Sequence, residues 1–177
     1  GADKFTPKMP QYYYYQYLHL AQIIDSGLQA EREGYDAFVL GGMLDHGRLE
    51  LREVLNIPVL FIGETSFYVA SQLSSKFAIV APGEVLLRGV QENVRRYGLA
   101  EHMVEGVHLG APSLPELVDL FVKKPRAVID MVAKAATKAI ERGSDMLVPG
   151  YGLLSLFLAD QGVREINGVP ILDNTGV

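Results

Sequence analysis

Hydrophobic residues follow two alternating patterns along the chain, one typical of helices and one typical of buried strands. Apolar residues at three- or four-residue spacing predict amphipathic helices over 18–33, 65–74, 84–98 and 126–142. Short apolar runs predict strands over 37–40, 59–63, 76–82, 104–109, 146–151 and 168–174. Because the run AFVL contains no polar residue, we expect this strand to be buried on both faces of a parallel sheet, and the segment with VLFI to be a second buried strand. The alternation predicts an α/β fold.

Helix boundaries can also be predicted from single residues. Gly34, Gly98 and Gly143 follow helical patterns and are expected to end them. Thr65 or Ser66 is expected to cap helix 65–74, and Ser113 the helix that begins near Pro115. Residues 1–17 are rich in tyrosine and have no period, which predicts a loop or an arm.

The chain contains an internal repeat. The pairs Gly34/Gly143, Asp36/Asp145 and Gly41/Gly150 are all 109 residues apart, and each copy continues into a second apolar strand. We therefore expect two α/β lobes, 1–75 and 76–177, with the change of lobe near Ser75. The first copy lacks an initial strand and the second lacks a final helix, so the natural protein is expected to be longer at both ends.

Composition narrows the function classes. The 16 basic and 21 acidic residues give a net charge of −5 without a basic cluster, which argues against a nucleic-acid partner. No run approaches the roughly 20 apolar residues of a membrane span, so a cytoplasmic protein is expected. The absence of cysteine excludes disulfides, thiolate catalysis and cysteine-bound metals. No phosphate loop, G-x-S-x-G elbow or H-E-x-x-H motif is present, and neither a cofactor nor a metal is expected.

Three segments carry a family resemblance: EGYDAFVLGGMLDHG at 33–47, NIPVLFIGETS at 56–66, and SDMLVPGYG at 144–152 together with GVPILDN at 168–174. They resemble the aspartate/glutamate/hydantoin racemase superfamily. The resemblance implies two pseudo-symmetric Rossmann-like lobes with parallel sheets and an active-site cleft between them. It also implies a cofactor-independent enzyme of the racemase and isomerase class that acts on a small carboxylate, and a homo-oligomer.

The chain departs from the family at its two catalytic cysteines, whose positions fall on Gly42 and Tyr151. Two-base racemisation needs an ionisable group on each side of the substrate carbon, and glycine has none. A branch similar to the arylmalonate decarboxylases keeps glycine at the first position and one cysteine at the second. A phenol has a pKa of about 10 and is therefore protonated at neutral pH. Tyr151 is thus suited to donate a proton to a carbanion. The hypothesis is a one-sided proton transfer such as decarboxylation; the alternative is that Tyr151 fills the space of the thiol.

Further residues are candidates for the cleft. His46 replaces the family's usual proline, and is either an acid–base or binding group or an exposed residue at a helix start. Asp45 stands where relatives often have an acid, and Glu64 either caps a helix or orients a binding loop. Free N–H groups at the helix starts beyond Gly42 and Gly152 suit a carboxylate, although such glycines also serve ordinary turns. The expected substrate-binding residues are Gly41, Gly42, Met43, Asp45, Glu64, Ala81, Pro82, Gly150 and Gly152.

Two function classes remain open at this point. The first is a carbon-acid enzyme, a racemase or isomerase by family and decarboxylase-like by its residues. The second is an inactive relative that binds a small carboxylate or acts as a structural subunit. The direction of the Tyr151 phenol distinguishes them, because a catalytic phenol must face an open cavity.

Overall fold

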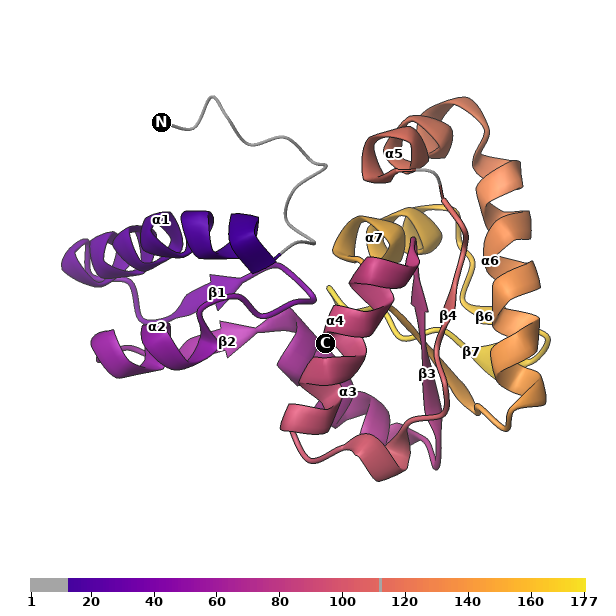
Figure 1. Cartoon of the computed structure of the whole chain (residues 1–177), viewed down its shortest axis with the longest axis horizontal. Helices are drawn as coiled ribbons and strands as arrows, with labels where there is room; N and C mark the ends of the chain where they lie inside the picture. The colour runs from indigo at the N-terminus through magenta and orange to yellow at the C-terminus, as the bar shows by residue number, and fades with distance from the viewer. Residues whose placement is uncertain (1–12, 112) are drawn as a thin grey trace.

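The computed structural model describes residues 13–111 and 113–177 (Figure 1). Its helices are α1 (Tyr13–Arg32), α2 (Arg48–Val54), α3 (Ile62–Leu73), α4 (Glu84–Arg96), α5 (Leu114–Lys123), α6 (Pro125–Glu141) and α7 (Gly152–Asp160), with a 3₁₀ turn at Ala100–His102. Its strands are β1 (Phe38–Leu40), β2 (Val59–Phe61), β3 (Phe77–Ala81), β4 (Val107–His108), β5 (Met146–Pro149), β6 (Glu165–Ile166) and β7 (Val169–Pro170).

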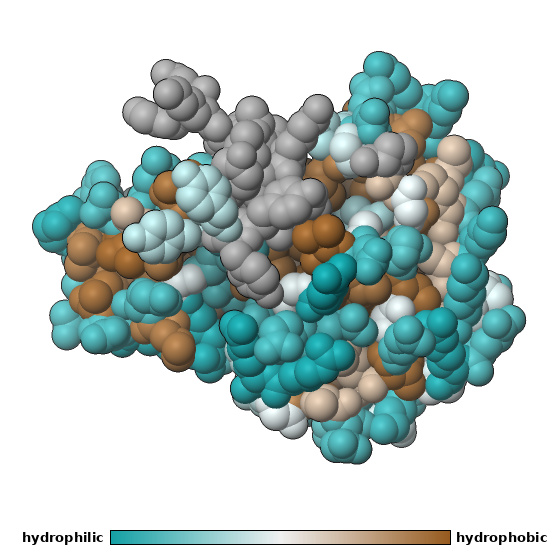
Figure 2. All heavy atoms as spheres, in the orientation of Figure 1, coloured by the Kyte–Doolittle hydropathy of each residue, from teal (hydrophilic) through white to brown (hydrophobic). Residues whose placement is uncertain are grey.

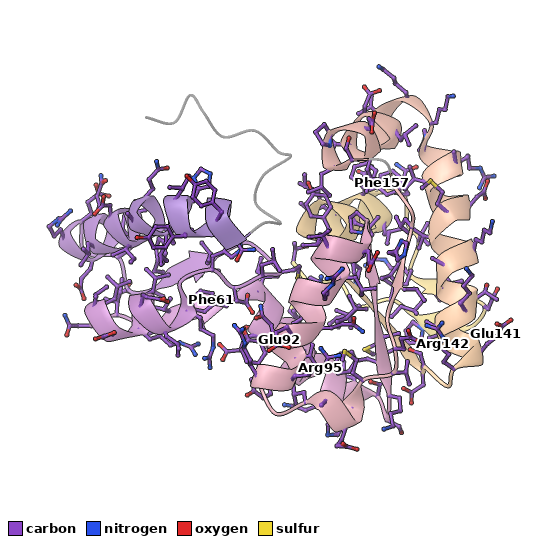
Figure 3. The ribbon with its side chains drawn as sticks, viewed as in Figure 1. Phe61, Glu92, Arg95, Glu141, Arg142 and Phe157 are labelled. Atoms are coloured by element: carbon purple, nitrogen blue, oxygen red, sulfur yellow. The ribbon has the colours of Figure 1, made fainter. Side chains whose placement is uncertain are left out.

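The strands form two parallel sheets in separate halves of the molecule (Figure 1). The smaller sheet pairs β1 with β2, and the larger has the order β4-β3-β5. Every residue of β3 and β5 is buried, since α3 and α4 pack on one face and α6 and α7 on the other. Phe157 of α7 belongs to this second layer (Figure 3) and stacks on Phe121 of α5 with ring centroids 4.5 Å apart. The predicted α/β fold with parallel sheets is confirmed.

Among the described residues, the smaller sheet is covered on one face only. Its core contains Leu51 and Leu55 of α2 with Val59 and Phe61 of β2 (Figure 3). Val39 and Leu60 are opposite each other in the parallel register, and they are 58% and 48% exposed. Apolar surface is visible in this half of the molecule in Figure 2. The prediction that β1 is buried on both faces is therefore wrong, and β2, predicted as a buried strand, is buried on one face.

Helix α3 connects the two halves. Its Phe67 and Ala70 belong to the core of the larger sheet, where Phe67 stacks on Phe77 with centroids 6.1 Å apart. The change of core thus follows Phe61 directly, while the boundary of the lobes near Ser75 stays a prediction. The helix begins at Ile62 without a side-chain cap, so the prediction of a cap at Thr65 or Ser66 is wrong. The predicted cap at Ser113 is confirmed, since its hydroxyl accepts a hydrogen bond from the Glu116 N–H at 3.3 Å.

Two other segments differ from their sequence patterns. Helix α1 already begins at Tyr13, within the stretch predicted as a loop or arm, of which residues 1–12 lie outside the described residues. The segment 168–174 contains the two residues of β7, which pair antiparallel with β6. Asn167 and Gly168 both have positive φ, at 51° and 79°, as the tight turn of a hairpin requires. One parallel bridge, between Leu147 and Ile171, remains of the expected parallel strand.

Within the part of the chain that the structure describes, none of the helices combines the length and the apolar character that crossing a membrane requires.

Helix α7 offers a matched test of the packing. Leu154 is fully buried in the core of the larger sheet, whereas Leu156 of the same helix is 48% exposed. We expect Leu154→Ala to lower the free energy of unfolding by about 3 kcal/mol, because it leaves a cavity, and Leu156→Ala to lower it by less than about 1 kcal/mol. Urea unfolding followed by circular dichroism measures both values. Equal losses in the two variants would contradict this packing of α7.

Candidate active site

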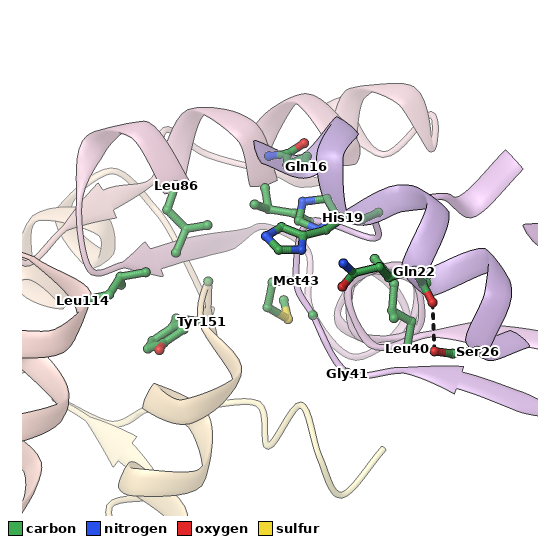
Figure 4. A pocket seen from close by; sticks show the side chains of 15 residues that line it. Gln16, His19, Gln22, Ser26, Leu40, Gly41, Met43, Leu86, Leu114 and Tyr151 are labelled. Carbon is green, nitrogen blue, oxygen red and sulfur yellow. Dashed lines mark hydrogen bonds between the residues drawn. The ribbon is translucent and has the colours of Figure 1, made fainter. Parts of the chain in front are cut away.

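A cavity of about 540 Å³ lies where α1 faces the ends of β1 and β5 (Figure 4). Its walls come from α1, from the loop 41–47 after β1, from α4 and α5, and from the end of β5. The lining residues are Gln16, His19, Gln22, Ile23, Ser26, Leu40, Gly41, Gly42, Met43, Leu44, His46, Leu86, Leu114, Gly150 and Tyr151.

The two repeated strand ends meet at this cavity. A Cβ at Gly150 would lie 2.8 Å from Cγ2 of Ile79 and 3.1 Å from Cβ of Ala81, so only glycine lets the end of β5 lie against β3 without displacing neighbours. A Cβ at Gly152 would lie 3.8 Å from the carbonyl oxygen of Gly41. The start of α7 is therefore a close neighbour of the chain that leaves β1.

The two positions that replace the family's cysteines both line the cavity, but the free volume around them differs. A Cβ at Gly42 would have no heavy atom of the described residues within 4 Å, apart from its neighbours along the chain. Tyr151 is partly buried against the cores on both faces of the larger sheet. The volume of a side chain is thus open at the first position and filled by an aromatic ring at the second.

The Tyr151 phenol lies at the start of α7, on the same side of the cavity as Leu86 and Leu114 (Figure 4). Burial raises the pKa of this phenol above its ordinary value. The group is therefore protonated at neutral pH and can donate a proton or a hydrogen bond.

His46 lines the cavity from the loop after β1 and is half-buried. Burial, together with the charge of His19, lowers the pKa of its imidazole to about 4. At neutral pH the ring is uncharged. Within the part of the chain that the structure describes, its Nε2 is buried and has no hydrogen-bond partner.

Asp45 and Glu64 do not line the cavity. The buried Asp45 carboxylate accepts hydrogen bonds from the Gly63 N–H at 3.0 Å and from the Tyr97 hydroxyl at 2.6 Å. Glu64, in the first turn of α3, forms ion pairs with Arg48 at 2.6 Å and Arg52 at 2.5 Å. Both acids thus connect elements of the fold.

Of the other sequence-predicted residues, Gly41, Met43 and Gly150 line the cavity, whereas Ala81, Pro82 and Gly152 do not. The carbonyls of Ala81 and Pro82 accept hydrogen bonds from the N–H groups of Leu109 and Ala111, which fixes the chain after β4. The structure therefore gathers about half of the predicted set around one cavity, and substrate binding by these residues stays a prediction.

Sequence reasoning missed the wall that α1 provides. Gln16, His19, Gln22 and Ser26 face the cavity from this helix, opposite Tyr151 (Figure 4). Their three- and four-residue spacing marks one helical face, but a polar face normally indicates solvent. No lysine or arginine is among the described residues that line the cavity. Within residues 13–111 and 113–177, no three histidine, aspartate or glutamate side chains are placed to hold a metal ion.

The open space at Gly42 leads to a test. Gly42→Cys should leave the free energy of unfolding unchanged within about 0.5 kcal/mol, because the added Cβ meets no atom of the residues that the structure describes. Since the chain has no other cysteine, Ellman's reagent should label this thiol in the folded protein. Val122→Cys, at a position that is 83% exposed, provides the accessible reference. A thiol at 42 that reacts only after unfolding would contradict an open cavity.

A second test concerns the neutral imidazole of His46. The pKa of His46 is about 4 in the folded state and 6.5 ordinarily, so between these values the unfolded state binds more protons than the folded state. The free energy of unfolding therefore decreases as pH falls from 6.5 to 4. From pH 7 to pH 4, the free energy of unfolding should therefore decrease by about 2 to 3 kcal/mol less in His46→Gln than in the unchanged chain. Urea unfolding at both pH values measures the difference. Equal losses would show that His46 titrates normally in the folded state.

The site can now be compared with known proteins. A sequence model of the family "Asp/Glu/Hydantoin racemase" matches residues 3–177. A hydantoin racemase from Pseudomonas sp. (strain NS671) is 30% identical over 173 residues, which cover 97% of this chain and 67% of that protein. The hydantoin racemase of Paenarthrobacter aurescens is 29% identical over 85% of this chain and 62% of its own length. The chain thus spans about two thirds of the length of these relatives.

Among solved structures, allantoin racemase from Pseudomonas fluorescens superposes with a TM-score of 0.75 at 23% identity, over 91% of this chain and 66% of that one. An arylmalonate decarboxylase superposes with a TM-score of 0.53 at 15% identity, over 86% of this chain and 69% of that one. These structural likenesses concern the fold. With the family match over nearly its whole length, the chain belongs to the Asp/Glu/hydantoin racemase family.

Proposed function

We propose that the protein is a cofactor-independent enzyme that protonates a carbanion from one side, with Tyr151 as the proton donor. The observation that carries the proposal is the position of the phenol, which lines the same cavity as the open site at Gly42. One protonated group facing one empty position suits a one-sided transfer, because only a single donor is present at the former cysteine positions.

The decarboxylation balances without a catalytic thiol. When a substrate carboxylate leaves as CO₂, its C–C bond breaks and the electron pair stays on carbon. The O–H bond of Tyr151 then breaks as the new C–H bond forms, and water returns a proton to the phenolate. The raised pKa of Tyr151 supports this role, because it makes the group a donor and not a base at neutral pH.

His46 supplies the second polar contact. Its uncharged ring has an unpartnered Nε2 that can bind a polar substrate atom. For a substrate that cannot lose CO₂, the imidazoles of His46 and His19 are the described groups of the cavity that can accept a proton, with Tyr151 as the donor. Inversion of the substrate carbon in one direction then uses a different pair of groups from the two cysteines.

The walls of the cavity narrow the substrate class. Its described polar side chains are amides, hydroxyls and imidazoles, including Gln16, Gln22 and Ser26 of α1, and no lysine or arginine of residues 13–111 and 113–177 lines it. Such groups suit a neutral ring with N–H and C=O groups, such as the hydantoin named in the curated relatives. Leu86 and Leu114 suit an apolar substituent on that ring. A small carboxylate, such as an arylmalonate, is the second substrate class, held by backbone N–H groups at the start of α7.

A turnover assay with both substrate classes tests the proposal. Tyr151→Phe should lower kcat at least about a hundredfold on arylmalonate or on a 5-substituted hydantoin, because general acid catalysis is lost while the ring remains. Tyr35→Phe, at a position that is 60% exposed, is the matched control and should keep full activity. Proton transfer is followed by incorporation of solvent deuterium at the substrate carbon. Unchanged turnover in Tyr151→Phe removes this residue from the mechanism.

The second candidate is an inactive relative that binds a small carbon acid or serves as a structural subunit. The missing ionisable group at Gly42 favours it. In this case a ligand raises the melting temperature of the protein, since it binds the folded state, and no substrate is turned over. Melting curves and turnover assays with the same compounds, taken together, therefore separate the two functions.

A further inference from the structure

One face of α4 contacts the loop 41–47, which we call the site loop, at three successive helical turns. Gly89, Asn93 and Tyr97 are four residues apart, which places them in one row along the helix and its end. All three contact the loop 41–47, which leaves β1 in the other half of the molecule. We call these three residues the α4 row.

Each member of the α4 row contacts a different group of the loop. Gly89 makes room for a side chain, because a Cβ there would lie 2.8 Å from Cδ2 of Leu44. The side-chain amide of Asn93 donates a hydrogen bond of 2.8 Å to the carbonyl oxygen of Leu44. The hydroxyl of Tyr97 donates a hydrogen bond of 2.6 Å to Oδ2 of Asp45.

Asp45 makes this contact specific. Its side chain is 5% exposed, and its φ of 48° lies in the left-handed region that a non-glycine residue adopts only when its surroundings hold it there. A buried carboxylate is costly unless donors surround it. Tyr97 supplies one donor from the second half, and the Gly63 N–H at the start of α3 supplies the other, at 3.0 Å.

The donor at Gly63 also excludes a larger residue. A Cβ at position 63 would lie 2.6 Å from Oδ2 of Asp45. Arg48 lies over the Tyr97 ring at 4.9 Å from its centroid, and Tyr68 stacks on the same ring at 6.4 Å. The phenol that reaches Asp45 is therefore itself held in place from α2 and α3.

Leu44 and Asp45 lie between Gly42 and His46, which both line the cavity, and Leu44 lines it as well. A displacement of this pair therefore moves the wall that the loop contributes to the cavity. We propose that the α4 row positions the site loop across the two halves of the molecule, with Tyr97 as a positioning residue that acts through Asp45. The functional meaning of this role rests on the proposed function, since the loop carries His46.

The test compares Tyr97→Phe with Tyr68→Phe in the full chain. Both variants keep the aromatic stack and lose one hydroxyl, but only the Tyr97 hydroxyl binds Asp45, whereas that of Tyr68 binds the backbone carbonyl of Tyr97 at 3.3 Å and leaves the bond to Asp45 in place. Hydrogen–deuterium exchange of residues 43–47 should become about tenfold faster in Tyr97→Phe, as expected for a lost hydrogen bond to a charged group, and stay unchanged in Tyr68→Phe. Exchange in β3 and β5 should be the same in both variants and in the unchanged chain.

A spectroscopic readout separates positioning from packing. A hydrogen bond to the ionised carboxylate favours ionisation, so Tyr97→Phe should move the titration of the Asp45 carboxyl to higher pH in ¹³C NMR. Tyr97 and Glu64 are the other titratable groups that act on this carboxyl, and Glu64 is left intact in the variant. In an Asp45→Asn background, Tyr97→Phe should change the exchange of the loop much less than it does in the unchanged chain.

Three results would overturn the inference: loop exchange that is unchanged in Tyr97→Phe, an equal effect in Tyr68→Phe, or an Asp45 titration that does not move. None of these measurements needs a substrate. Failure of the inference is therefore distinguishable from failure of the proposed function, which turnover by Tyr151→Phe decides.

Discussion

The close approach of glycine backbone to neighbouring residues at the strand ends is the constraint on which the rest of the structure depends. Gly150 lies against Ile79 and Ala81 with no room for a Cβ, so β5 can pair with β3 up to its last residue before the chain turns into α7. The same turn brings Gly152 next to the carbonyl of Gly41. Because no side chain separates them, the two halves share one cavity, and the residue between the two glycines, Tyr151, contributes to its wall.

The apolar runs of β3 and β5 predicted the larger sheet correctly, because continuous hydrophobic segments of that length are stable only when both faces are covered. The same reasoning failed for Val39 and Leu60, since a local pattern does not say whether a covering layer exists. The Asn-Gly pair at Asn167 and Gly168 is typical of a hairpin turn, whereas the apolar run and the internal repeat predicted a strand over 168–174.

For the site, the sequence led to Gly42, His46 and Tyr151, which do line one cavity. It did not indicate the polar face of α1, because glutamines and a histidine on a helix look the same whether they face water or a cavity. Asp45 and Glu64 were expected near a substrate, and the structure places them in hydrogen bonds between elements. Their partners Tyr97 and Arg48 follow from tertiary packing, which spacing along the chain does not encode.

The contact between Leu44 and Gly89 has a consequence for how this protein can change over time. The two positions share one volume, since a methyl group at 89 would lie 2.8 Å from the end of the leucine side chain. A larger residue at one position calls for a smaller one at the other, so the two are expected to covary among descendants of this sequence. The loop 41–47 thus shares its packing space with a helix that lies more than 40 residues further along the chain, and a loop grafted from a relative is expected to pack without displacing α4 only if its residue at position 44 fits the one at position 89.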